Sequence, residues 1–410
     1  AKELTPSMTA GINKENIVGI ITETGGKTSH SAILARALEI PAVLSVNGAV
    51  SKLSAGTYVI VDGSEGVVID EPDDAVIQEY DTKRINFLKE RKELENFRGK
   101  ATKALSGEEY ELFCNIGKPE DAIKAVDADG EGVGLFRTEF LFMDRTALPT
   151  EDEQFDAYKK AALTLKGKPV IIRTLDIGGD KEIPYLGLKK EENPFLGFRA
   201  IRYCLKHKDL FKTQLRAIVK ASAFGDVRIM FPLITAVEEL REGKALVEEV
   251  KAELREQGVE FNENIPVGIM TETSAAVMIA DILAKESDFF SIGTNDLTGY
   301  TMACDRGNDD VAYLYSPLQP SVLRGIKYII DCANKNNISV GMCGEAAANP
   351  MMVPLLMSFG LTEFSVSAPS VLKVRKTISA WSKAEADKVA EKVLAMTTEK
   401  EISDYLKTLL

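Results

Sequence analysis

The sequence predicts an α/β protein that consists of a small α/β domain, a long helical linker and a (β/α)8 barrel. A chain of 410 residues is long enough for two or three domains. In its larger part, β-like runs alternate with amphipathic helical stretches eight times over about 300 residues, and (β/α)8 barrels typically take about 250. We therefore expect a domain at residues 1–72, a linker at 73–104 and the barrel at 105–410.

Residues 1–72 contain short apolar runs separated by turn residues, which is typical of a small α/β domain. We expect a helix at 28–39, where four apolar residues share one face. The expected strands are 15–22, 41–46, 57–63 and 66–70. The chain starts with AKELTPSMTAG, which has neither an initiator Met nor a signal-peptide pattern, so we expect this domain to be incomplete at its N-terminus.

The linker segment 73–104 is rich in Lys, Arg and Glu and contains no glycine before Gly99. Tyr80, Phe87 and Leu94 recur at a constant heptad spacing and predict a narrow apolar stripe along one long helix. Two interpretations remain open, because such a helix can pack on the surface of one domain or connect two domains.

The barrel segment contains eight runs that read as buried strands, and helical stretches such as 236–257 and 321–336 separate most of them. The regular alternation favours a closed parallel barrel. A doubly wound open sheet is the main alternative, since periodicity alone does not establish closure. The expected strands are 110–116, 132–137, 169–176, 227–233, 266–273, 288–294, 338–344 and 363–367.

Composition excludes several classes of function. The net charge of −12 argues against general binding to nucleic acid or to anionic membranes. No apolar stretch reaches the roughly 18 residues that a membrane-spanning helix needs. The five cysteines form no CxxC pair, which favours a reducing compartment over a disulfide framework, so we expect a cytoplasmic protein.

Polar residues gather at the ends of the predicted strands, where a (β/α)8 barrel has its active site. Several cations at one mouth indicate a strongly anionic substrate, because arginine binds phosphate and carboxylate oxygens through two hydrogen bonds. Two carboxylates on adjacent strands suit Mg²⁺ that bridges to a phosphate. Any single one of these residues could instead form an ordinary salt bridge. The candidates are Arg137, Arg173, Lys181, Arg199, Glu272, Asn295, Asp296, Arg306 and Cys343.

His30 follows two glycines, a lysine and two hydroxyl residues, and it opens an apolar run. Thr28 or Ser29 can cap the predicted helix, whose free amide groups would bind a phosphate carried by His30. The alternative is a histidine at a helix start without a role. The second histidine, His207, is interpreted as a surface residue.

Cys343 has two interpretations. A lone cysteine is more often a buried structural thiol, whereas beside an enolate a thiol could donate a proton to carbon. We expect the remaining cysteines to be structural; they are Cys114, Cys204, Cys304 and Cys332.

Taken together, these motifs resemble a family of phosphoenolpyruvate-using enzymes. GGKTSHSAILARALEIPAV is similar to the phosphohistidine signature shared by Enzyme I, phosphoenolpyruvate synthase and pyruvate phosphate dikinase. GLFRTEFLFMDR, RTLDIGGDK, ENPFLGFRAIR, FFSIGTNDLTGYTMACDRGND and GMCGEAA resemble the phosphoenolpyruvate-binding barrel of that family. The pair RTLDIGGDK and FRTEFLFMDR is most similar to Enzyme I, the phosphoenolpyruvate–protein phosphotransferase of bacterial sugar transport, and the likeness covers nearly the whole chain.

The resemblance implies a role for each matching residue. His30 would accept the phosphoryl group, Thr9 would help to orient its imidazole, and Cys343 would protonate the enolate of pyruvate. Glu272 and Asp296 would ligate Mg²⁺. The residues implied to bind phosphoenolpyruvate are Arg137, Arg173, Lys181, Arg199, Asn295 and Arg306.

The resemblance further implies a swivelling phosphohistidine domain, transfer from phospho-His30 to the carrier protein HPr, and a homodimer formed through the barrel. In Enzyme I a helical carrier-docking subdomain and a leading strand precede LTPS. We expect both to be missing from this chain, so carrier docking is in question. The family pattern ETPAAV is ETSAAV here, with Ser274 in place of proline.

Three alternatives remain at the level of sequence. One is a fragment of a synthase or dikinase, although no nucleotide-binding motif supports it. A second is a non-catalytic regulatory paralogue, although His30, Glu272, Asp296 and Cys343 are all present. A third is partial function, with autophosphorylation but no transfer.

Overall fold

The computed structural model describes residues 1–3, 16–25, 35, 40–143, 145–178 and 183–410. Its contacts divide the chain into two compact units, Ala1–Glu93 and Leu94–Leu410. The domain limits at residues 72 and 104 stay predictions. Among the described residues, no helix combines the length and the apolar character that crossing a membrane requires.

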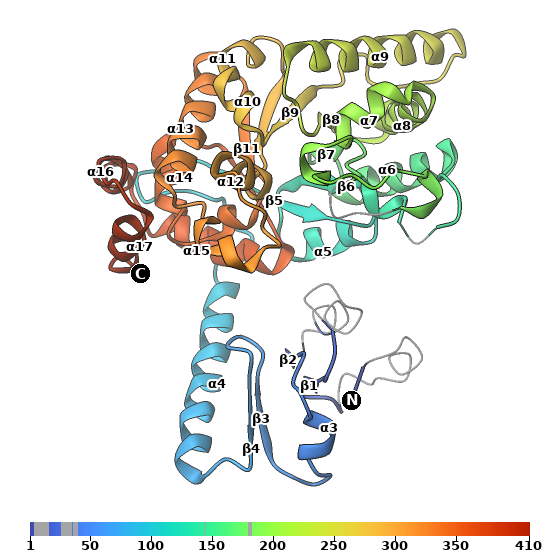
Figure 1. Ribbon diagram of the computed structural model, residues 1–410. Helices are drawn as coiled ribbons and strands as arrows, with labels where there is room; N and C mark the ends of the chain where they lie inside the picture. The colour runs from blue at the N-terminus through green and yellow to red at the C-terminus, as the bar shows by residue number, and fades with distance from the viewer. Residues whose placement is uncertain (4–15, 26–34, 36–39, 144, 179–182) are drawn as a thin grey trace. The chain divides into compact units, whose positions relative to one another are not determined.

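The first unit contains two small sheets (Figure 1). Strand β1 (Ile20–Ile21) pairs in parallel with β2 (Ala42–Val43), and β3 (Val59–Asp62) pairs antiparallel with β4 (Val67–Asp70). Each lies within an expected strand, so the four strand predictions are confirmed at shorter lengths. A short helix, α3 (Ala49–Lys52), follows β2. The helix expected at 28–39 lies outside the described residues except for Ala35.

Helix α4 (Asp74–Glu95) confirms the long helix predicted after the small domain. None of its residues, all of which the structure describes, is buried, and the Phe87 side chain is 57% exposed. Of the predicted stripe, Phe87 is therefore exposed, whereas Tyr80 and Leu94 are half-buried. Lys83 of α4 forms ion pairs with Glu79 at 3.3 Å and with Glu65 at 3.4 Å, and Glu65 lies in the turn between β3 and β4.

The second unit contains eight parallel strands that close into a barrel in sequence order, with β12 pairing β5. Closure confirms the barrel and excludes the open sheet. All eight strands fall within the predicted segments. They are β5 (Glu111–Ile116), β6 (Gly132–Arg137), β7 (Val170–Arg173), β8 (Val227–Phe231), β9 (Val267–Thr271), β10 (Phe289–Ile292), β11 (Ser339–Met342) and β12 (Glu363–Val366).

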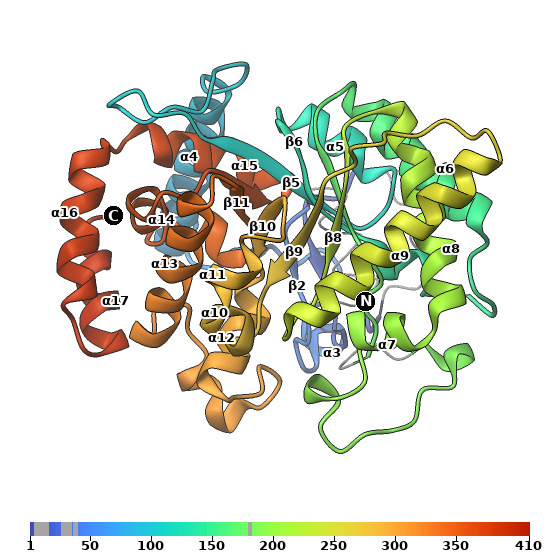
Figure 2. The ribbon, with the colours of Figure 1, turned by 90° about the horizontal axis from the view of Figure 1, so that it is seen from above.

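Helices surround these strands, with α6, α8 and α9 on one side and α13, α14 and α15 on the other (Figure 2). The predicted stretches 236–257 and 321–336 correspond to α9 and α13. The helices are α5 (Asp121–Asp127), α6 (Glu151–Leu165), α7 (Ala200–Lys206), α8 (Lys208–Ala221), α9 (Val237–Glu256), α10 (Ser274–Met278), α11 (Ala280–Leu283), α12 (Thr294–Met302), α13 (Pro320–Lys335), α14 (Val353–Phe359), α15 (Val371–Ser379), α16 (Lys383–Leu394) and α17 (Glu399–Lys407).

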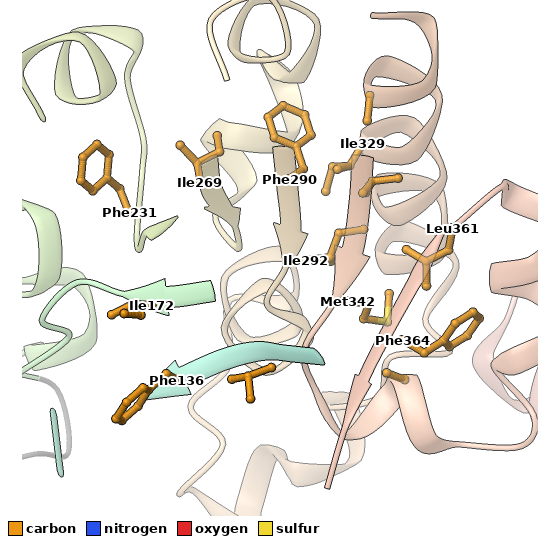
Figure 3. Packing of buried hydrophobic residues seen from close by; sticks show 14 of the residues in the cluster. Phe136, Ile172, Phe231, Ile269, Phe290, Ile292, Ile329, Met342, Leu361 and Phe364 are labelled. Carbon is orange, nitrogen blue, oxygen red and sulfur yellow. The ribbon is translucent and has the colours of Figure 1, made fainter. Parts of the chain in front are cut away.

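Side chains alternate between the two faces of each barrel strand, as the period of two requires. One set, including Ile172, Phe231 and Phe290, joins the large apolar cluster that also contains Ile329 of α13 (Figure 3). The other set fills the barrel interior as a separate cluster of Leu135, Ile171, Met230, Met270, Phe289 and Cys343. This double burial explains why the strands read as nearly continuous apolar runs.

Arg375 ties helix α15 to the segment before the barrel and is only 1% exposed. Its guanidinium donates to Thr102 Oγ1 at 3.0 Å, to the Phe97 carbonyl at 3.1 Å and to the Asp129 carbonyl at 2.9 Å, and it also pairs with the Asp129 carboxylate. Truncation would leave several of these acceptors without a donor.

We expect Arg375→Ala to lower the free energy of unfolding of the barrel by about 3 kcal/mol, as for other broken buried ion pairs. Urea denaturation followed by circular dichroism measures the change. Lys373→Ala, on the exposed face of the same helix, is the control and should stay within about 0.5 kcal/mol of the original protein. Equal stability of the two variants would contradict this role of Arg375.

Candidate active site at the carboxyl ends of the barrel strands

The candidate site lies where the barrel strands end, because parallel strands bring their carboxyl ends to one mouth. Arg137 and Arg173 are the last residues of β6 and β7. Glu272 directly follows β9, and Cys343 directly follows β11. The strand-end positions predicted from the sequence are therefore correct for these four residues.

Arg173 is buried within a frame of acidic groups. Its guanidinium lies 2.9 Å from Glu139 Oε1 and 3.1 Å from Asp176 Oδ2. Glu139, Asp176 and also Glu272 raise the pKa of Arg173 against the opposing effect of burial, so it stays charged. Its Nε atom is buried and has no hydrogen-bond partner, which leaves one donor available at the site.

Arg199 continues the same network from the start of helix α7. Its Nη2 donates to Asp176 Oδ1 at 2.8 Å and to Asp296 Oδ2 at 3.0 Å. Asp176 and Asp296 raise its pKa although burial opposes them. Gly178 permits this approach, because it has a φ of 101° and a Cβ there would lie 2.6 Å from the Arg199 Cβ. The Arg199 Nε is also buried without a partner.

Glu272 and Asp296 supply the carboxylates. Glu272 is 2% exposed, and one of its oxygens accepts a hydrogen bond from the Leu233 amide at 2.7 Å. Burial raises the pKa of Glu272 to about 8, with Asp296 and Asp176 adding to the effect and the two arginines opposing it. Asp296 lies in the first turn of α12. These carboxyl groups repel one another, and a divalent cation would relieve that repulsion.

The described residues contain no group of three or more His, Cys, Asp or Glu side chains arranged to hold a metal ion. A cation here would therefore take Glu272 and Asp296 from the protein and its remaining ligands from elsewhere. Mg²⁺ typically binds in this way, through one or two carboxylates together with water and phosphate oxygens. The donor set fits that ion.

Cys343 is 7% exposed and faces the barrel interior. Its sulfur accepts a hydrogen bond from Ser291 Oγ at 3.2 Å, and its amide donates to the Ile292 carbonyl at 3.1 Å. Burial raises the pKa of the Cys343 thiol to about 12, although Ser291 and Arg173 lower it. The thiol is therefore protonated at neutral pH and could act as a proton donor.

Three other predicted residues lie further out. Arg137 is exposed and lies over the Phe140 ring at 4.9 Å. Arg306 is exposed at 5.5 Å from the ring of Phe195, which Arg199 also faces at 5.7 Å. Asn295 has an exposed side chain.

The structure brings together Arg173, Arg199, Glu272 and Asp296 in one network. Three predicted residues lie outside the described part of the chain; they are Thr9, His30 and Lys181. Glu139 and Asp176, the acidic partners of the arginines, were not among the residues predicted from the sequence. Glu139 lies in the motif FRTEF and Asp176 in RTLDIGGDK. Their closeness in sequence to a strand-end arginine was the signal that could have identified them.

Comparison with known proteins identifies the family. Residues 91–382 match the family described as PEP-utilising enzyme, PEP-binding domain, and residues 1–66 match its mobile domain. The chain is 48% identical over 408 residues to the phosphoenolpyruvate-protein phosphotransferase of Priestia megaterium, covering 100% of this chain and 71% of that one. The chain belongs to the phosphoenolpyruvate–protein phosphotransferase family.

Two further members of the phosphoenolpyruvate–protein phosphotransferase family agree. The proteins of Bacillus subtilis (strain 168) and Geobacillus stearothermophilus are each 49% identical over 407 residues and 99% of this chain, which spans 71% and 70% of their lengths. The protein is thus an enzyme of phosphoenolpyruvate-dependent phosphoryl transfer, as the sequence predicted.

The pKa of Glu272 sets an expected dependence of stability on pH. Its pKa is about 8 in the folded protein against 4.5 in its ordinary state, so between these values the folded chain holds a proton that the unfolded chain releases. In metal-free buffer, stability should therefore fall as pH rises from 4.5 to 8. Glu272→Gln should remove on the order of 4 kcal/mol of that fall.

Urea denaturation of both proteins at the two ends of this range measures the effect. Glu260→Gln, which replaces an exposed carboxylate, is the control and should keep the original slope. If Glu272→Gln kept the original slope of stability against pH, the carboxyl group of Glu272 would not be protonated in the folded protein.

Proposed function

We propose that this chain transfers the phosphoryl group of phosphoenolpyruvate to His30, releases pyruvate, and passes the group to the carrier protein HPr in sugar phosphotransfer. The single observation that best supports the proposal is the network at the barrel mouth. There, Arg173 and Arg199 lie in one buried cluster with Glu272 and Asp296, in a chain whose relatives are named for this reaction.

The arginines are suited to hold a substrate with both phosphate and carboxylate groups. The Nε atoms of Arg173 and Arg199 are buried donors without partners, and buried donors are normally satisfied, so an anion with several oxygens would complete them. Arg137 and Arg306 add exposed cations near the same strand ends. We add Lys181 and Asn295 to this set because they lie in motifs that resemble those of the family.

Glu272 and Asp296 would hold Mg²⁺ in this proposal. When bound, the ion would neutralise negative charge on the phosphate oxygens. The two carboxylates would fix its position, and Arg199 would keep Asp296 oriented through their 3.0 Å contact. The arginines would stabilise the charge that develops on the transferring phosphoryl group.

His30 would attack the phosphorus atom in line, with Thr9 orienting its imidazole. Enolpyruvate would leave, and Cys343 would protonate it at carbon, since its thiol is neutral and lies at the end of β11. We also infer a cytoplasmic homodimer, following the family.

Labelling tests the proposal directly, because the chain has only two histidines. His30→Ala should lower the incorporation of label from [³²P]phosphoenolpyruvate at least about a hundredfold, because the nucleophile is lost. His207→Ala is the matched control, since His207 is exposed and packs its ring against Tyr203 at 4.2 Å. Labelling of His30→Ala at the original level would refute the proposal. Adding HPr then shows whether the label moves on.

Magnesium binding should tighten as pH rises from 6 to 8, by up to about tenfold per unit, because protons compete for Glu272. Isothermal titration calorimetry measures the dissociation constant. Glu272→Gln should weaken binding at least about tenfold and remove most of the pH dependence. Glu260→Gln should change neither quantity. Magnesium affinity that is independent of both pH and Glu272 would exclude this carboxyl group as a ligand.

A further inference from the structure

Glu363 is a buried carboxyl group in the barrel interior that the proposed function leaves without a role. It is the first residue of β12 and is 6% exposed. Its Oε1 atom is buried without a hydrogen-bond partner. Two glycines make room for it, since a Cβ at Gly134 would collide with Oε1 and a Cβ at Gly341 would lie 2.8 Å from the same atom.

Glu363 lies in one row of the barrel with Ser291. In the strand register, Ser291 of β10 pairs with Gly341 of β11, and Gly341 pairs with Glu363 of β12. Because Gly341 has no side chain, the Glu363 carboxyl group occupies the space above it in this row. Ser291 is 1% exposed and donates its hydroxyl hydrogen to the Cys343 sulfur at 3.2 Å.

In the proposed reaction Cys343 loses its thiol proton and must regain it. After giving its proton to carbon, the sulfur would be a thiolate in an environment that strongly disfavours the charged form. Cys343 is 7% exposed, so bulk water has little access to it. A donor inside the barrel would restore the thiol before the next turnover.

We propose that Glu363 is this donor and that Ser291 links it to Cys343; the proposal rests on the function proposed above. The Cys343 S–H bond breaks as the C3–H bond of pyruvate forms from the enolate electron pair. The thiolate takes the hydroxyl proton of Ser291, and the Ser291 oxygen takes the carboxylic proton of Glu363. Solvent then returns a proton to the Glu363 carboxylate, so that one solvent proton reaches C3 per turnover.

The surroundings of Glu363 suit a carboxyl group that holds a proton until it is needed. Burial raises its pKa to about 8, Glu111 of β5 adds to the effect, and Arg228 of β8 opposes it. Arg228 is itself paired with Asp226 at 2.7 Å. Glu363 in turn helps to raise the pKa of Cys343, which directly follows β11. Glu111 pairs with Glu363 in the register and is exposed, which gives solvent protons a route to the start of the strands.

Isotope exchange tests this path without a carrier protein. The enzyme is incubated in D₂O with Mg²⁺, phosphoenolpyruvate and [¹⁴C]pyruvate, and two quantities are followed. Carbon exchange into phosphoenolpyruvate reports the reversible transfer. Deuterium at C3, corrected for uncatalysed exchange, reports how often the thiol exchanges its proton with solvent. A thiolate without a donor can only take its proton back from another pyruvate, so carbon exchange continues without deuterium.

We expect Glu363→Gln and Ser291→Ala to lower the deuterium incorporated per carbon exchange at least tenfold. Ser222→Ala is the control: it also removes a buried hydroxyl, but that hydroxyl donates to the Val219 carbonyl at 2.6 Å, at the end of helix α8. It should keep the original ratio.

An unchanged ratio in both Glu363→Gln and Ser291→Ala would overturn the path, and so would an equal loss in Ser222→Ala. If Glu363→Gln fails to fold, Ser291→Ala decides alone. Absence of carbon exchange in the unmodified chain would instead refute the proposed function, and the path with it.

Discussion

The candidate site depends on one chain of alternating charges, in which Glu139, Arg173, Asp176, Arg199 and Asp296 follow one another at contacts of 2.8 to 3.1 Å. Burying a guanidinium is unfavourable unless acidic groups and hydrogen bonds compensate it. Asp176 is the central member because it contacts both arginines. Without it, each arginine would keep a single acidic partner, Glu139 for Arg173 and Asp296 for Arg199, and no negative charge would join the two cations.

The same chain of charges accounts for two opposite binding preferences at one mouth. The arginines direct most of their hydrogen bonds to acidic partners, but each keeps one buried Nε donor without a partner, which favours an anion. Glu272 is buried beside this network, and the negative charges of Asp296 and Asp176 that act on it favour a cation. A site that attracts both suits a phosphate ester accompanied by a divalent metal ion. The arrangement therefore matches the chemistry for which the family is named.

Much of the fold could be predicted because each barrel strand is buried on both faces and reads as an apolar run. The strand ends then located Arg173, Glu272 and Cys343. The sequence places the acidic partners near strand-end arginines but does not show the contacts, because the pairing of Glu139 with Arg173 depends on how β6 and β7 lie side by side. The role of Glu363 was hidden for a similar reason: the interior position of a glutamate at a strand start follows from the barrel's register, which the sequence does not display.

The same register leaves an unusual space in the barrel interior. The interior of a (β/α)8 barrel is ordinarily filled with branched apolar side chains, yet Gly134 and Gly341 here leave space for a buried carboxyl group. Such a group destabilises the fold, because a polar atom without a partner loses its hydration and gains no hydrogen bond. Apolar side chains at these positions would fill the barrel at lower cost. An unfavourable arrangement of this kind, in the same row of the barrel as Ser291, is what a path for protons between the start of the strands and the mouth requires.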